Sequence, residues 1–245
     1  MSLKRGGLWA TFSLGVLLVA VLIRLGFWQL DRAQQKRFLY GQYSAVAHAS
    51  ALPVGATPSA ELTAQLWRPV TVTGQFVAKS LLLDNRVRDG IVGYEVLSPF
   101  QLVDGRVVLV DRGWLKAPDL RSDWPTVVVP STAATLSGRL APSPSTGIHL
   151  SNAVLIEPGP SGIWRTQSID FPALSEALSV NLEPFIVLLD DGIESGYDRH
   201  WTLPVADDGK HQAYAVQWFT MAACVPLLLA YWVRRSRYSS SGEAS

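Results

Sequence analysis

The chain has 245 residues, of which 48% are hydrophobic, and its formal net charge is +1. A nearly neutral chain lacks the basic surplus that nucleic-acid-binding proteins use, so we predict no nucleic-acid partner. The single cysteine, Cys224, excludes an internal disulfide and also CxxC metal or redox chemistry.

The charges are unevenly distributed along the chain. Residues 31–210 carry 15 Lys and Arg against 19 Asp and Glu, whereas the two ends together carry 6 against 1. Basic ends around an acidic middle are typical of a membrane protein whose ends stay in the cytoplasm while its middle has crossed the bilayer.

The first predicted element is a transmembrane helix over residues 8–30. Trp9 and Trp28 bracket an apolar stretch of about 30 Å of helix, which matches the hydrocarbon core of a bilayer. No small-residue cleavage site follows closely, which favours an uncleaved anchor over a removed signal peptide. The short stretch before the helix is unlike a mitochondrial presequence and favours a bacterial source. Helix formers over residues 29–45 predict that the helix continues beyond the membrane.

Short β-rich segments separated by turn residues follow. Residues 48–63 are rich in Pro, Ala and Ser and are predicted to form a loop or linker. In residues 67–76, valines alternate with threonines, which predicts a strand with one buried face. Residues 171–179 are the one clear predicted helix of this region. The predicted fold is an α+β membrane protein, in which two transmembrane helices flank a mainly antiparallel β domain, a small sheet or open barrel with one or two helices.

Three predicted strands end in aspartate: Asp84, Asp111 and Asp190. Asp is a good turn former, which explains the pattern without any further function. The alternative is a cluster of carboxylates that holds a metal or forms an acid–base pair, and no other motif supports it.

The second predicted transmembrane helix spans residues 211–233. Three arginines follow it at once, and two aspartates precede it, which places the C-terminus in the cytoplasm. Two spans then place the N-terminus there as well, and the middle in the periplasm of a bacterial inner membrane. The predicted segments are a cytoplasmic N-terminus (1–7), a span (8–30), a periplasmic β-rich domain (31–210), a span (211–233) and a cytoplasmic tail (234–245).

His211 stands at the start of the second span and shares one helical stripe with Tyr214, Ala215 and Trp218. A helix N-terminus disfavours a charged imidazolium, and a neutral ring is the state that an iron ligand needs. Tyr214 and Trp218 offer flat surfaces for a porphyrin, with Ala215 leaving room between them. The alternative is a histidine beside an ordinary aromatic belt at the membrane surface.

Arg24 lies within the first span, a few residues before Trp28. The simple interpretation is snorkelling, in which the long stem lies in hydrocarbon while the guanidinium reaches the headgroups. The functional alternative is a buried cation that faces the other span and binds a carboxylate such as a haem propionate. A nucleophile elbow, zinc motif, P-loop and dinucleotide fingerprint are all absent from the sequence, so we predict that the chain is not an enzyme.

Five segments occur in an order and spacing that resemble the surfeit locus protein 1 family: LGFWQLDRAQQKR, WRPVTVTGQF, RDGIVGYEVLSPF, VVLVDRGWL and HQAYAVQWF. The matching positions are Gly26, Trp28, Gln29, Leu30, Arg32, Lys36, Gly93, Tyr94, Pro99, Phe100, Arg112, Gly113, Trp114, His211, Tyr214, Trp218 and Phe219. Four positions depart from the family pattern: Gln35, Asp111, Gly209 and Gln212. At Asp111, asparagine is common in the family.

The resemblance implies an assembly factor for haem–copper cytochrome c oxidase. Its implied partners are oxidase subunit I, with haem a synthase as a further candidate, and the lipid bilayer. It also implies transient binding of haem a, with His211 as the iron ligand, joined in our prediction by Tyr214, Trp218 and Arg24. The sequence does not identify a second iron ligand, since His149 and His200 both fall in loop-like stretches. A cofactor-free scaffold that docks oxidase subunits is the alternative function.

Overall fold

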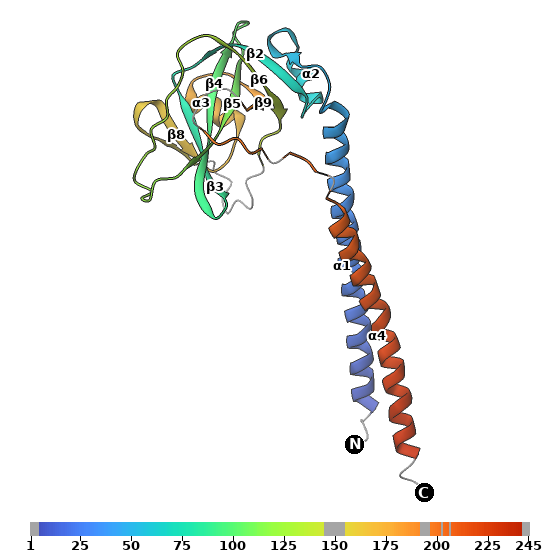
Figure 1. Ribbon diagram of the computed structural model, residues 1–245. Coiled ribbons are helices and arrows are strands. Elements are labelled where there is room, and N and C mark those ends of the chain that lie inside the picture. Colours follow the sequence, from blue (N-terminus) through green and yellow to red (C-terminus); the bar gives the residue numbers. More distant parts are fainter. Residues whose placement is uncertain (1–4, 145–154, 192–196, 202, 206, 242–245) are drawn as a thin grey trace. The chain divides into compact units, whose positions relative to one another are not determined.

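The computed structural model describes residues 5–144, 155–191, 197–201, 203–205 and 207–241. The chain divides into two compact units, one built from residues 1–41 and 204–245 and the other from residues 42–203. The first unit is a pair of helices and the second is a β domain, and each is described by itself below (Figure 1).

The helical unit is formed by the two ends of the chain. Helix α1 runs from Arg5 to Val46, its last turn belonging to the β unit, and α4 runs from Gly209 to Ser241. The two helices lie side by side and antiparallel, with both termini at the same end of the pair (Figure 1). As the helix formers of residues 29–45 predict, α1 continues well beyond its apolar stretch.

Both helices are long and apolar enough to cross a membrane. Large apolar side chains are exposed along them, including Leu14 (67%), Leu17 (62%), Leu227 (69%) and Leu228 (65%). Such a continuous apolar surface is costly in water, but it is the normal exterior of a helix in a bilayer. The helical unit is therefore suited to a membrane.

The β domain contains nine strands among the residues described. They are β1 (Leu52–Pro53), β2 (Pro69–Phe76), β3 (Ser80–Arg88), β4 (Ile91–Leu102), β5 (Val107–Lys116), β6 (Ala134–Ala141), β7 (Ile156–Pro158), β8 (Ile163–Thr166) and β9 (Leu182–Leu189). Short helical elements are η1 (Val54–Ala56), α2 (Ser59–Ala64), η2 (Pro160–Gly162) and α3 (Phe171–Leu178). The predicted helix at 171–179 is confirmed, and Asp170 caps it by accepting from the backbone N–H of Ala173 at 3.0 Å.

Five of these strands close into a small barrel. The sheet order is β1-β2-β6-β9-β5-β4-β3-β8-β7, and an additional pairing of β2 with β4 closes the ring β2-β6-β9-β5-β4. Most pairings are antiparallel, but β5 and β9 run parallel, so the barrel is mixed. The predicted α+β fold class is confirmed, and the strands β3, β8 and β7 extend the sheet beyond the barrel.

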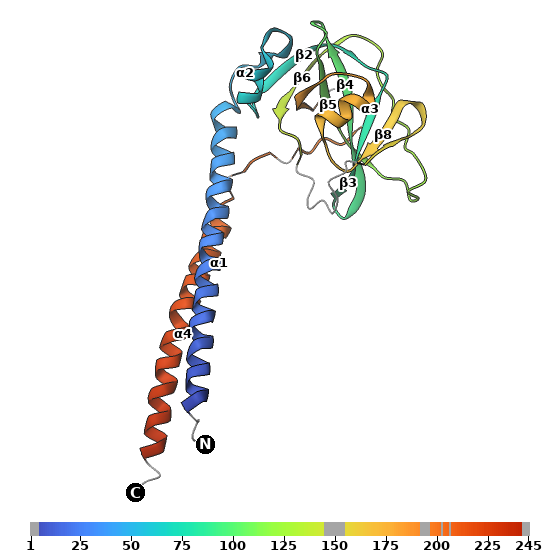
Figure 2. The ribbon, with the colours of Figure 1, turned by 180° about the vertical axis from the view of Figure 1, so that it is seen from behind.

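The core of the domain lies on both sides of the sheet. Within the barrel, Phe100 and Phe185 are fully buried and pack with the valines of β2. The alternation in β2 is as predicted, because Val70 and Val72 are buried while the threonines between and after them are not. On the outer face, α3 buries Leu174 and Leu178 against leucines of neighbouring strands (Figure 2).

Two local features refine the predicted loops. The β3–β4 hairpin turns through Asp89 (φ 48°) and Gly90 (φ 78°), and this Asp-Gly pair is the one that a two-residue type I′ turn requires. Residues 48–63, predicted as a loop or linker, are more ordered than that: they contain β1, η1 and most of α2. Their order comes from tertiary packing, since Val54 and Leu62 are both fully buried in the barrel core.

Candidate functional site

The helix pair packs through a stripe of small residues. On α1 the buried positions are Gly15, Leu22, Gly26 and Ala33, separated by seven, four and seven residues, and on α4 they are Ala215 and Ala222. This spacing keeps one face of each helix turned toward its partner. Gly26 leaves room for a large side chain of α4, because a Cβ there would lie 2.5 Å from the ring of Phe219. The contact positions the polar side chains on either side of the stripe.

His211 is joined to α1 by a hydrogen bond. Its Nδ1 lies 2.7 Å from Oε1 of Gln29, a residue 182 positions earlier in the chain. The amide oxygen accepts only, so Nδ1 donates in this contact, and a neutral imidazole held in this way has its lone pair on Nε2. In metal sites, an acceptor on the ring nitrogen that does not bind the metal orients the histidine and sets its tautomer. The contact therefore leaves Nε2 of the half-buried imidazole as the ring nitrogen that could bind a metal.

The aromatic side chains predicted to lie beside His211 differ in their exposure. Tyr214 is 53% exposed and Trp218 is half-buried, and both lie on α4 within two turns of the histidine. The predicted role of Ala215 is wrong, because its side chain is 1% exposed and is packed in the contact with α1. Ala215 packs in the contact between the helices and does not form an open gap between Tyr214 and Trp218.

Arg24 lies away from this group. It is exposed, and it stands two residues, roughly 200° of helix, from both Leu22 and Gly26, which are buried in the contact with α4. Arg24 therefore faces away from α4, and the structure does not bring it together with His211. This position agrees with the snorkelling interpretation and gives no support to a propionate-binding role.

Ion pairs join the two helices at the end where α4 begins. Arg37 donates from Nε to the Oδ2 of Asp208, and Lys36 lies 3.9 Å from Asp207. The hydrogen bond from Arg37 holds the pKa of Asp208 below its usual range. Neither pair follows from a motif, since the partners are distant in sequence and lie in polar segments without periodicity. Together they align the two helices beside His211 and Gln29.

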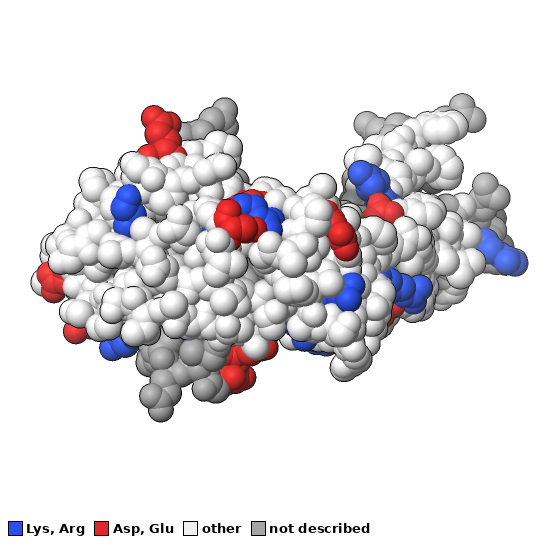
Figure 3. Space-filling view, turned by 90° about the horizontal axis from the view of Figure 1, so that it is seen from above, with Lys and Arg blue, Asp and Glu red and all other residues white. Residues whose placement is uncertain are grey.

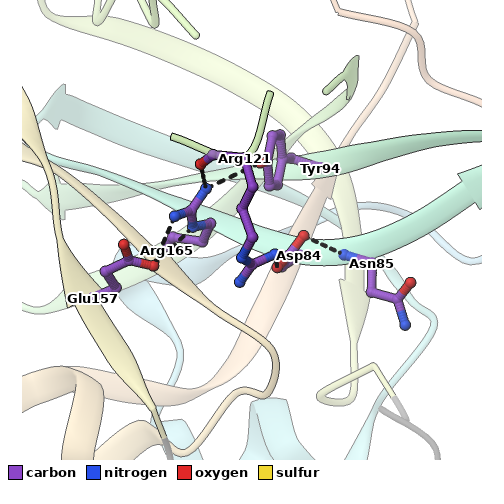
Figure 4. Close-up of polar contacts among 6 residues, drawn as sticks. All are labelled: Asp84, Asn85, Tyr94, Arg121, Glu157 and Arg165. Atoms are coloured by element: carbon purple, nitrogen blue, oxygen red, sulfur yellow. Dashed lines mark hydrogen bonds and ion pairs between the residues drawn. The ribbon is translucent and has the colours of Figure 1, made fainter. Parts of the chain in front are cut away.

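The β domain contains a second polar cluster (Figure 4). Asp84 pairs with Nη1 of Arg121 at 2.6 Å, beside a pocket of about 320 Å³ that is also lined by Tyr94. Arg165 donates to Glu157 from two nitrogens at 3.0 and 2.8 Å, and its Nη1 donates to the carbonyl of Arg121 at 3.0 Å. These contacts hold the segment after β5 against β3, β4 and β8. The cluster therefore has a structural role.

The three aspartates predicted to end strands do not form a metal cluster, and only Asp190 directly follows a strand, β9. The Oδ1 of Asp84 accepts from the backbone N–H of Asn85 at 2.8 Å, and that of Asp111 accepts from the N–H of Gly113 at 3.1 Å. Asp190 is exposed. Within the part of the chain that the structure describes, three or more His, Cys, Asp or Glu side chains nowhere lie together as a metal site. The turn-former interpretation is wrong for Asp84 and Asp111, because they lie within β3 and β5 and are buried.

The remaining sequence candidates add no site. His200 pairs with Asp198, and His149 lies outside the described residues. On the face seen in Figure 3, acidic and basic side chains are interspersed, and this face has no broad patch of one sign. The pair of His211 and Gln29 is therefore the strongest candidate for a ligand-binding site.

Comparison with known proteins agrees with this organisation. The model of the SURF1 family matches residues 16–223, which include most of α1, the whole β domain and the first part of α4. The chain belongs to the SURF1 family. A SURF1-like protein of Rickettsia felis is 29% identical over 230 residues, covering 88% of this chain and 92% of that protein. An uncharacterised SURF1-like protein of Mycobacterium bovis is 28% identical over 184 residues, covering 72% of this chain and 65% of that protein. The relatives are bacterial, and the family motifs noted in the sequence include both Gln29 and His211.

Proposed function

We propose that this SURF1 family member is a membrane-bound assembly factor for haem–copper cytochrome c oxidase. In this proposal it binds haem a transiently and assists its insertion into subunit I, with haem a synthase as a candidate donor. The basic ends and acidic middle of the chain support a bacterial inner-membrane topology with both termini in the cytoplasm and the β domain in the periplasm.

The observation that carries the haem proposal is the hydrogen bond between His211 and Gln29. Haem iron binds a neutral imidazole nitrogen, and the contact with Gln29 engages Nδ1, so that Nε2 is the ring nitrogen left for a ligand. The residues present therefore fit an axial ligand. Tyr214 and Trp218 supply aromatic surface on the same side of α4. When bound, haem a is the cargo, and the chain's own contribution is to orient one ligand and cover part of a porphyrin face.

The test is the absorption spectrum of the full chain purified from a haem-a-producing host. The wild-type chain should carry a Soret band, and His211→Ala should lose it. His48→Ala is the matched control, because His48 is an exposed histidine of the β unit that plays no part in the proposal. A Soret band of equal intensity in His211→Ala would sink the ligand assignment.

Gln29 gives a finer test of the same site. Gln29→Leu removes the acceptor and should weaken haem binding by about 10–100-fold, the usual cost of losing such a partner. Gln29→Glu keeps an oxygen acceptor and should retain binding. Equal affinity of wild type and Gln29→Leu in a haem titration is incompatible with an orienting role for Gln29.

A cofactor-free scaffold is the second candidate, and one feature of the β domain favours it. At the β3–β4 hairpin, Val87 is 57% exposed, Ile91 46% and Val92 51%. Three exposed apolar side chains at one hairpin are a candidate protein contact. Under this alternative, Val92→Asp should abolish co-purification of oxidase subunits, whereas His211→Ala should leave it intact. The reverse pattern favours the haem function.

A further inference from the structure

A groove of about 320 Å³ lies between α1 and α4. Its floor is formed by Ala33 and Ala215, which are buried in the contact between the helices. The groove lies on the opposite side of this contact from His211. On α4, His211 precedes Ala215 by four residues, whereas the lining residue Gln212 precedes it by three, and these offsets point to opposite sides. The groove is thus separate from the proposed haem ligand.

The walls of the groove change from polar to apolar along its length. Arg37, Gln34 and Gln212 line the end nearest the start of α4. Leu30, Val216 and Phe219 line the other end. Arg37 and Leu30 are seven residues apart, which is about 10 Å along a helix. The groove therefore passes from a charged end to a hydrocarbon-like end over roughly the depth of a lipid headgroup region.

The charged end of the groove contains the guanidinium of Arg37, which pairs with Asp208. Asp208 accepts from Nε of Arg37 and also from the side-chain amide of Gln212. The Arg37 side chain is 61% exposed, and among the described residues it pairs with Asp208 through Nε. The contact with Asp208 uses Nε, which leaves the two terminal nitrogens of the guanidinium as possible donors to a ligand. The planar guanidinium matches the spacing of the oxygens of a phosphate.

The apolar end of the groove exposes hydrophobic side chains, which are stabilised by contact with apolar groups and not by water. Val216 is 65% exposed and Leu30 36% exposed, in helices whose length and composition suit a bilayer. A partner helix would have to bring apolar surface to one end and an acidic group to the other. One bilayer phospholipid has both parts in this order and at this spacing.

We propose that the groove is a phospholipid-binding site. The phosphate binds the terminal nitrogens of Arg37, and an acyl chain lies along Leu30, Val216 and Phe219. The lipid fills the side of the helix pair that is opposite His211, and it holds α1 and α4 together where their small residues leave the contact shallow. This site does not depend on haem binding.

Native mass spectrometry of the full chain in detergent, titrated with phosphatidylglycerol, tests the site. Val216→Trp fills the groove, and Arg37→Gln removes the phosphate ligand. Each should lower the fraction of chain carrying one lipid by about tenfold at a given lipid concentration. Ala213→Trp is the control for bulk, because Ala213 is exposed and lies two residues from Ala215, on the far side of α4. Lys36→Gln is the control for charge, since Lys36 pairs with Asp207 and does not line the groove.

Both controls should bind lipid as the wild type does. Wild-type binding by Val216→Trp would overturn the proposal. So would an equal loss in Val216→Trp and Ala213→Trp, because that result indicates only a general shell of lipid around the helices. Circular dichroism of each variant shows whether the helix pair is intact. If Arg37→Gln loosens the helices, Val216→Trp still tests the site, because it keeps the Arg37–Asp208 pair.

Discussion

Closure of the β barrel depends on the close approach of two backbones at Gly74. This residue pairs with Leu102 of β4 as well as with a residue of β6, so it lies where the ring of strands closes. A Cβ built on Gly74 would lie 1.9 Å from the carbonyl oxygen of Gln101. An ordinary C···O contact is about 3.3 Å, so Gly74→Ala must move one strand by more than about 1 Å.

The cost of this displacement follows from the contacts that it breaks. β2 and β4 pair over only three positions, and the pairing has little length over which to absorb a shift. Loss of two or three backbone hydrogen bonds costs about 1 kcal/mol each. The edge-to-face contact of Phe76 with Phe100, at 4.9 Å between ring centroids, contributes about 0.5–1.5 kcal/mol more. Gly74→Ala should therefore destabilise the domain by about 3–4 kcal/mol.

Thermal unfolding of the full chain in detergent, followed by the β-sheet signal in circular dichroism, measures this effect. For a protein of this size the expected fall in Tm is roughly 10 °C. Gly55→Ala is the matched control, since a Cβ there meets only Val103 Cγ2 at an ordinary 3.8 Å. It should change stability by less than about 1 kcal/mol. A fall in Tm for Gly74→Ala no larger than that for Gly55→Ala refutes the account of barrel closure.

Two buried charges give further predictions. Burial, with the nearby carboxylate of Glu95, raises the pKa of Asp111 well above its usual range, so the folded state disfavours its ionised form. The contribution of Asp111 to stability is therefore complete below its unfolded pKa of about 4 and is lost as pH rises through the folded pKa. Asp111→Asn keeps an oxygen to accept from Gly113, so it should be more stable than wild type at pH 7. In denaturant titrations this difference in stability should vanish below about pH 4. A difference in stability that does not depend on pH contradicts this account. Arg165→Lys keeps the charge but loses the guanidinium fork, so the segment after β5 should be released at a cost of about 2–3 kcal/mol. Tryptic cleavage at Arg121 should then accelerate, and an unchanged rate argues against this role of Arg165.

The central family motif is explained by packing within the β domain. Trp114 lies over Gly93, where a Cβ would come within 2.3 Å of the indole ring. The indole Nε1 donates to the carbonyl of Arg86 at 2.7 Å. A glycine and a tryptophan on paired strands therefore form one structural unit. The spacing of such residues in the sequence signals the family but does not distinguish a packing role from a binding role.

The candidate site was only partly predictable from the sequence. The position of His211 at the start of a helix follows from the change of a polar segment into a long apolar run. The role of Gln29 could not be derived in the same way, because Gln29 belongs to another helix. Its match to a family motif does not show how far it lies from His211. Arg24 illustrates the converse error, since a charge within a span attracts attention while only helix packing shows that it faces outward.

Local chemistry in the sequence determined the two apolar helices, the β-rich middle and the helix at Phe171–Leu178. These features depend on hydrophobic periodicity, run length and capping, which are properties of neighbouring residues. The tertiary structure alone decided the parallel pairing of β5 with β9, the closure of the barrel at Gly74 and the contact between His211 and Gln29. Such contacts join residues that are far apart in the chain, and their partners are selected by packing that no local pattern records.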